Sequence, residues 1–233
     1  INKGQIKSMT EYNYRRLKHH NMNNRYNIGS MLVHYLVKSQ NYKSAFEIGV
    51  DNGGTFELLM NICDVVHGID LNDRIHKNTR RVLDKSSQHN FTICDSTKFK
   101  PYGLWDFINA DGNHDYKFAI NDINIAKEML APAGTIMADD GIWHSGVIQA
   151  LEEFFSKNKD YVPFLADEQA IYIHRVASNK EDFIDNILPS IFGKFCYIHD
   201  FEYAGFTIPK IACLPAVTRD NEVFDLIVEN NNF

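Results

Sequence analysis

The sequence has few cysteines and no excess of positive charge, and each absence excludes a class of protein. Its four cysteines lie far apart and form no Cys-x-x-Cys pair, so they predict neither a zinc site nor a disulfide framework. They indicate a reducing compartment instead. The formal net charge of −6 argues against a nucleic-acid-binding protein.

Long apolar runs are also missing. No segment approaches the roughly 20 apolar residues that a membrane-spanning helix needs, and no basic-then-apolar signal peptide opens the chain. We therefore expect a cytoplasmic protein without a membrane span. The chain begins with Ile1 in place of Met, which predicts a processed product or a domain of a longer protein.

The composition is sufficient for a globular core. The chain has 233 residues, of which 44% are hydrophobic and 12% aromatic. This length favours one domain with appendages. We predict a lead-in segment at 1–27, a core domain at 28–177, and a C-terminal extension at 178–233 that packs on the core.

Short apolar runs alternate with segments of helical spacing from residue 45 onward, which is typical of a parallel α/β sheet. The predicted strands lie at 45–49, 65–70, 91–94, 105–110 and 134–138. The predicted helices lie near 9–20, 28–40, 55–62, 73–86, 116–130, 145–157 and 180–192. Residues 161–165 and 170–176 predict a hairpin, and the aromatic alternation at 195–206 predicts added β structure or an oligomer contact.

A glycine-rich loop follows the first predicted strand, from Glu47 to Thr55. Its glycines allow a tight turn and let a ligand approach the main chain closely, although an ordinary strand–helix turn is the alternative. The loop lacks the Gly-Lys-Ser/Thr ending of a phosphate-binding P-loop. Its spacing also differs from the dinucleotide pattern Gly-x-Gly-x-x-Gly, which disfavours a nicotinamide-dependent dehydrogenase.

The next two predicted strands also end in acids, Asp70 before Leu71 and Asp95 before Ser96. Asp70 can accept hydrogen bonds from ribose hydroxyls, and Asp95 can accept one from an adenine amino group. The alternatives are a surface acid for Asp70 and a helix N-cap for Asp95. Open α/β sheets bind ligands at the carboxyl ends of their strands, where all these residues lie.

With these motifs, residues 28–175 resemble the class I S-adenosylmethionine-dependent methyltransferases. The resemblance implies a Rossmann-like α/β fold with a mostly parallel seven-stranded sheet that ends in an antiparallel hairpin strand. It also implies S-adenosylmethionine as cofactor and S-adenosylhomocysteine as product. It assigns cofactor binding to Glu47, Gly49, Asp51, Gly53, Gly54, Thr55, Asp70, Leu71, Asp95, Ser96 and Asp111.

A second set of acids follows the fourth and fifth predicted strands, at Asp111 and at Asp139–Asp140. Neighbouring strands lie about 4.8 Å apart, so these carboxylates should converge, and they cannot all stay ionised without a cation. Oxygen ligands suit Mg²⁺, with Mn²⁺ or Ca²⁺ as alternatives. His114 lies one turn beyond Asp111 and should face the same place; capping roles are the alternative for each acid.

Residues 111–116 and 139–143 resemble a narrower group, the metal-dependent sugar O-methyltransferases of macrolide biosynthesis of the mycinamicin and tylosin type. The resemblance implies that Asp111, Asp139 and Asp140 bind the metal and that His114 is the general base, so that His114, Asp111 and Asp140 form the catalytic centre. One departure is Asp139, where glutamate can occur in the group. His144 is read as a surface or packing residue, and Trp143 and Tyr116 as an acceptor wall or core residues.

The expected function is therefore transfer of a methyl group from S-adenosylmethionine to a sugar hydroxyl of a glycan or glycoside, such as that of a rhamnose. A domain fused to glycosyltransferases, as in a chlorovirus glycan-modifying enzyme of the host cytoplasm, is one such setting. A catechol or phenol methyltransferase and a catalytically silent cofactor-binding module remain as alternatives.

Overall fold

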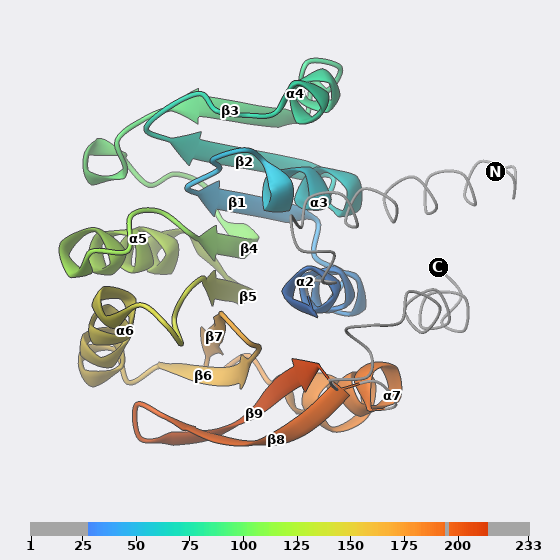
Figure 1. Ribbon diagram of the computed structural model, residues 1–233, viewed down its shortest axis with the longest axis vertical. Helices are drawn as coiled ribbons and strands as arrows, with labels where there is room; N and C mark the ends of the chain where they lie inside the picture. Colours follow the sequence, from blue (N-terminus) through green and yellow to red (C-terminus); the bar gives the residue numbers. More distant parts are fainter. Residues whose placement is uncertain (1–27, 194–195, 214–233) are drawn as a thin grey trace, which may run out of the picture.

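The computed structural model describes residues 28–193 and 196–213, and within these ranges nine strands form one sheet. The strand order is β3-β2-β1-β4-β5-β7-β6-β9-β8 (Figure 1). The strands are β1 (Ser44–Ile48), β2 (Val65–Asp70), β3 (His89–Ile93), β4 (Trp105–Ala110), β5 (Leu130–Ala138), β6 (Tyr161–Ala166), β7 (Ile171–Arg175), β8 (Cys196–Tyr203) and β9 (Phe206–Cys213).

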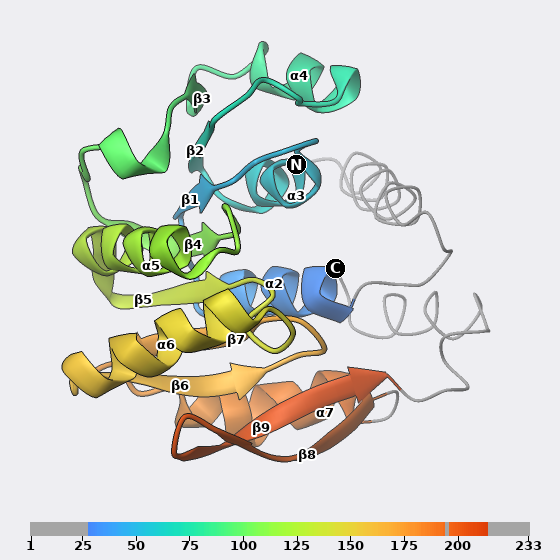
Figure 2. The same cartoon turned by 60° about the vertical axis from the view of Figure 1, so that its left-hand side comes forward.

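Helices cover both faces of the sheet. One face carries α2 (Ile28–Ser39), α3 (Gly54–Ile62) and α7 (Leu188–Phe192), and the other carries α5 (Tyr116–Met129) and α6 (Ser145–Lys157). Figure 2 shows α5 and α6 side by side over the middle of the sheet. The helix α4 (Lys77–Leu83) precedes β3, the 3₁₀ turn η1 (Ser96–Lys98) follows it, and the π-helical turn η2 (Phe183–Ile187) leads into α7.

Two apolar clusters fill the space between the sheet and these helices. Leu32, Leu36 and Phe56 belong to the first, and Ile123 and Phe154 to the second; all are almost fully buried. The central strand β1 contributes to both clusters, because a strand covered on both faces buries side chains of either orientation. This explains why the apolar residues of the strand, Ala45, Phe46 and Ile48, do not alternate regularly with polar residues.

The pairing confirms the predicted methyltransferase-like sheet. Strands β1 to β5 pair in parallel, while β7 lies between β5 and β6 and runs antiparallel to both. Several elements differ from expectation, among them the helix predicted near 73–86, which is shorter and spans Lys77–Leu83. The strand β5 begins at Leu130 directly after α5, earlier than the predicted start at residue 134, and its first part lies beside a register shift opposite Trp105–Phe107. The predicted helix at 180–192 contains the π-turn η2.

The predicted β structure after residue 194 is confirmed and lengthens the same sheet. Strands β8 and β9 form a hairpin whose turn residues, Ala204 and Gly205, have φ of 50° and 84°. Paired positive φ values match the right-handed twist of the flanking strands. Strand β9 continues the sheet next to β6. The predicted lead-in at 1–27, with its helix at 9–20, and residues 214–233 lie outside the described residues.

None of the helices in the described ranges has the length and apolar character that crossing a membrane requires.

Lys180 ties the segment after β7 to the rest of the fold. Its buried Nζ donates to Gln40 Oε1 at 2.9 Å, to the Tyr42 hydroxyl at 2.7 Å and to the Ala133 carbonyl at 2.8 Å. These acceptors come from the α2–β1 connection and from β5. All three are uncharged, so burial lowers the pKa of the Lys180 ammonium to about 8.

Lys180 should therefore make the free energy of unfolding depend on pH. An unfolded lysine has a pKa of about 10.4, so between pH 8 and 10.4 the unfolded chain binds more protons and stability rises with pH. We expect wild type to gain about 1 kcal/mol relative to Lys180→Met between pH 7 and pH 9, measured by urea unfolding. The exposed Lys43→Met is the matched control, with a difference from wild type that stays the same at both pH values. A constant difference for Lys180→Met as well would contradict the assignment.

Candidate active site

The ends of the central parallel strands bring the predicted acids together. Ile48 is in register with Ala110, and Ala110 with Ala138. The backbone pattern continues one residue further, since Asp111 N–H donates to Ile48 O at 2.8 Å and Asp139 N–H donates to Ala110 O at 3.1 Å. The residues after β1, β4 and β5 therefore lie abreast at one edge of the sheet.

Glu47 is a buried carboxylate in this edge. Its Oε1 accepts from Asn109 Nδ2 at 2.8 Å, while its Oε2 is buried and has no hydrogen-bond partner among the described residues. Burial raises the pKa of Glu47 well above its usual value, and the nearby acids Asp111, Asp139 and Asp70 add to this. A buried oxygen without a partner is costly, so this atom is suited to a cationic or hydrogen-bonding ligand.

The glycines of the loop are required by the protein backbone itself. Gly49 has φ of 86°, and a Cβ there would lie 1.9 Å from the Asp111 carbonyl oxygen. Gly53 has φ of 89°, and its Cβ would lie 2.8 Å from Thr79 Cγ2. Gly54 and Thr55 open α3, with Gly54 N–H donating to Asn52 Oδ1. The glycines thus allow β1, β4 and α4 to approach closely, whatever the ligand.

Asp70 pins the loop beside the end of β2. Its Oδ2 accepts from the backbone N–H of Asp51 and its Oδ1 from that of Asn72, both at 2.8 Å. The next residue, Leu71, is 64% exposed, and Ile93, the register partner of Asp70 on β3, is 62% exposed. Two exposed apolar side chains at adjacent strand ends are suited to contact a flat ligand group. Ile93 was not predicted, because a strand residue with this periodicity reads as core.

Asp95 has the capping role that the sequence leaves as an alternative. It is the N-cap of η1, and its Oδ1 accepts from Thr97 N at 3.0 Å and from Thr97 Oγ1 at 2.7 Å. These hydrogen bonds lower the pKa of Asp95. Ser96 is the first residue of the same turn. The contact of Asp95 and Ser96 with an adenine stays a prediction.

The acids after β4 and β5 repel one another. Burial and the carboxylates of Asp111 and Asp140 raise the pKa of Asp139 to about 8. Burial also raises the pKa of Asp111, although His114 opposes the shift. Carboxylates arranged in this way ionise together only when a cation joins them. Carboxylate oxygens are the ligands that Mg²⁺ prefers. Among the described residues, the ligand atoms that lie within 4.8 Å of one another belong to His114, Asp140 and His144.

His114 lies between two of these acids. Its Nε2 is 3.5 Å from Asp111 Oδ1, and its Nδ1 is 3.4 Å from Asp140 Oδ2. The hydrogen bond to Asp111 and the charges of the acids raise the pKa of His114, against the effect of its partial burial. The predicted proximity of His114 to the acids is thus present in the structure.

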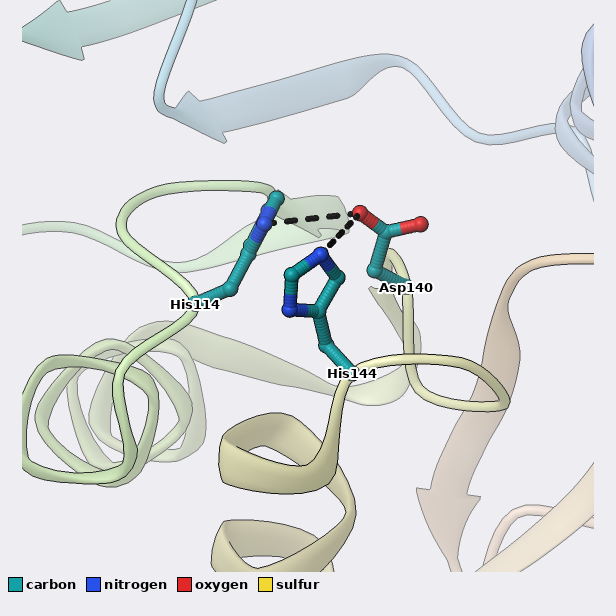
Figure 3. A group of neighbouring side chains, drawn as sticks. All are labelled: His114, Asp140 and His144. Carbon is teal, nitrogen blue, oxygen red and sulfur yellow. Dashed lines mark ion pairs between the residues drawn. The ribbon is translucent and has the colours of Figure 1, made fainter.

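His144 joins the same group, which the sequence interpretation did not expect (Figure 3). Its Nε2 is 3.9 Å from Asp140 Oδ2, and its ring centroid is 4.6 Å from that of His114. Asp140 has φ of 55°, and its carbonyl accepts from His144 N–H at 3.0 Å. This tight turn brings Asp140 and His144 together just before α6. The i,i+4 spacing of the two residues is the only sequence signal that could have suggested it.

Comparisons with known proteins bear on the type of domain and on its fold. Residues 46–141 match the family model described as a methyltransferase domain. No curated protein matches the chain significantly. Among solved structures, the O-methyltransferase NovP is 15% identical, with a TM-score of 0.54 over 64% of this chain and 81% of that one.

Two further solved structures are similar. A putative caffeoyl-CoA O-methyltransferase from Staphylococcus aureus is 17% identical, with a TM-score of 0.54 over 63% of this chain and 82% of that one. The Podospora anserina methyltransferase PaMTH1 is 13% identical, with a TM-score of 0.52 over 75% and 88%. At such identities the likeness shows the fold. The likeness and the family match therefore show a Rossmann-like methyltransferase fold in which residues 46–141 are similar to a methyltransferase domain.

Gly49, at the start of the loop, and Gly54, at the start of α3, should differ sharply in how well they tolerate substitution by alanine. Gly49→Ala must relieve both a positive φ and a clash with the Asp111 carbonyl, so we expect a loss of about 3 kcal/mol in unfolding free energy. The melting temperature should fall by about 6–12 °C. Gly54→Ala is the control, since its Cβ would meet only Asn52 Oδ1, at 3.5 Å, and should leave the melting temperature unchanged or slightly higher. Equal effects of the two substitutions would refute this account.

Proposed function

We propose that this chain is a metal-dependent O-methyltransferase that transfers the methyl group of S-adenosylmethionine to a sugar hydroxyl. The observation that carries the proposal is the convergence of Asp111, Asp139 and Asp140 at adjacent strand ends, with His114 between Asp111 and Asp140. A methyltransferase that needs neither metal nor base has no use for this costly group of charges. The match to a methyltransferase domain supports the reaction type.

The cofactor would lie across the ends of β1, β2 and β3. When bound, S-adenosylmethionine supplies a methyl group already activated by the sulfonium charge. The buried Glu47 Oε2, which has no protein partner among the described residues, is placed to accept from the amino group of the cofactor. Asp70 would accept from the ribose hydroxyls, and the exposed Leu71 and Ile93 would contact the adenine.

Asp111, Asp139 and Asp140 would hold a divalent ion, Mg²⁺ or Mn²⁺. Such an ion supplies Lewis acidity, which lowers the pKa of a hydroxyl bound to it. Its positive charge would also return Asp139, whose pKa is raised to about 8, to the ionised form at neutral pH. The protein's task is then to orient the acceptor oxygen toward the methyl carbon and to exclude water.

His114 is suited to accept the proton of the acceptor hydroxyl. The carboxylates of Asp111 and Asp140 flank its two ring nitrogens and stabilise the imidazolium that forms. The same contacts fix the orientation of the ring. A base oriented in this way removes the need for water to carry the proton away.

Trp143 supports a ring-shaped acceptor. Its side chain is 68% exposed, and its indole N–H donates to the Glu168 carbonyl, so the ring is held while its surface stays open. An exposed aromatic face beside Asp140 can stack against the C–H face of a sugar. It can equally stack against a catechol, so a phenolic acceptor is the second candidate. The similarity of the fold to that of a putative caffeoyl-CoA O-methyltransferase also supports this candidate.

A methyl-transfer assay tests the proposal directly. Incubation with methyl-labelled S-adenosylmethionine and a panel of free sugars, glycosides and catechols should label a sugar in the presence of Mg²⁺. EDTA should abolish the transfer, and added Mg²⁺ should restore it, because the acceptor hydroxyl is activated by the ion. Transfer that persists in EDTA would refute the metal requirement, and labelling of catechols alone would select the second candidate.

The His114→Ala variant tests the base. Loss of a general base should lower kcat by roughly 100- to 10,000-fold, because the proton then has no acceptor in place. Binding of S-adenosylhomocysteine, measured by calorimetry, should stay at the wild-type level. His199→Ala on the outer strand β8 is the control and should retain full kcat. Wild-type turnover in His114→Ala would remove His114 from the mechanism.

A further inference from the structure

His114, Asp140 and His144 form a second, nitrogen-rich group of possible metal ligands beside the carboxylates (Figure 3). One ligand atom from each residue lies within 4.8 Å of the others. We propose that these three residues bind a borderline transition-metal ion of the Zn²⁺ type, and that this ion occupies the site in competition with the use of His114 as a base. The binding part of the proposal stands independently of the proposed function, and the competition part rests on it.

The distances suit a small tetrahedral ion. Zinc–nitrogen and zinc–oxygen bonds of about 2.0–2.2 Å at tetrahedral angles place ligand atoms about 3.4 Å apart. His114 Nδ1 and Asp140 Oδ2 are already 3.4 Å apart. His144 Nε2 and Asp140 Oδ2 are 3.9 Å apart, so a small rotation of the His144 side chain, which is 55% exposed, would close this gap.

The surroundings of His114 support coordination through Nδ1. Its opposite nitrogen, Nε2, faces Asp111 Oδ1 at 3.5 Å. Histidines that bind metals commonly donate their other N–H to a carboxylate, which fixes the tautomer and makes the coordinating nitrogen a better ligand. Asp111 would fill that outer role here, while Asp140 supplies the direct oxygen ligand.

The backbone holds Asp140 and His144 in a fixed relation. The His144 N–H donates to the Asp140 carbonyl, and the Tyr203 hydroxyl donates to the Gly141 carbonyl between them at 2.8 Å. The turn is thus anchored from the hairpin β8–β9. A ligand pair on an anchored turn loses little conformational freedom when it binds an ion.

The ligand set separates this site from the proposed magnesium site. Two imidazoles and one carboxylate suit Zn²⁺, Co²⁺ or Ni²⁺, whereas Mg²⁺ prefers oxygen ligands only. The two sites share Asp140, so the two kinds of ion would exclude each other. An ion at His114 Nδ1 also engages the proposed base, so zinc should inhibit methyl transfer that magnesium supports.

Cobalt titration tests the binding, because Co²⁺ bound by nitrogen in a four- or five-coordinate site absorbs visible light far more strongly than hydrated Co²⁺. Metal-free wild type should develop these bands, Zn²⁺ should remove them, and excess Mg²⁺ should not. His144→Ala should weaken Co²⁺ binding by roughly 100-fold or more, since even outer partners of a metal site account for 10- to 100-fold. Circular dichroism would verify that the variant is folded.

Asp139→Asn is the matched variant, because it alters the carboxylate set and leaves the three proposed ligands intact. It should keep the wild-type cobalt spectrum and affinity. Unchanged binding in His144→Ala, or equal loss in both variants, would overturn the proposed site. In the transfer assay at fixed Mg²⁺, Zn²⁺ should inhibit wild type. If no acceptor is methylated under any condition, the proposed function fails while the cobalt result still decides the site.

Discussion

The parallel register of β1, β4 and β5 is the constraint on which the rest of this structure depends. Because Ile48, Ala110 and Ala138 lie abreast, the residues that follow them must also lie abreast, and two of these are Asp111 and Asp139. The arrangement concentrates negative charge at one edge of the sheet, together with the buried Glu47. The fold thus holds mutually repelling carboxylates close together, and burial and this repulsion raise their pKa values.

The same constraint explains residues that hold the protein backbone around this edge. Asn109 occupies β4 opposite Glu47 and donates to its carboxylate, so that one oxygen is satisfied and the other is left available. Gly49 must lack a side chain because the Asp111 carbonyl lies against it. Both carboxylate oxygens of Asp70 accept hydrogen bonds from backbone N–H groups, and these bonds fix the loop after β1. Positions that read as ligand contacts in the sequence are therefore also parts of the backbone architecture.

Much of the fold can be predicted from the sequence, because apolar runs at 45–49, 65–70 and 105–110 are local signals. The same holds for the acids that end these runs, since parallel strands bring their carboxyl ends to one edge. The joining of β9 to β6 could not be predicted, because it depends on pairing between residues distant in sequence. The approach of His144 to Asp140 depends on a left-handed φ at a non-glycine residue, which sequence patterns seldom reveal. The capping role of Asp95 was foreseen only as an alternative.

The hydrogen bond from Tyr203 to the Gly141 carbonyl links the outermost hairpin to the turn that carries Asp140. The hairpin β8–β9 lies beyond β6 and is not part of the parallel half of the sheet. Its buried Tyr203 nevertheless holds the loop between β5 and α6 in place through this hydrogen bond. Changes in the length or twist of this hairpin would therefore be transmitted to the acidic edge, so a segment that looks like an appendage helps to set the shape of that edge.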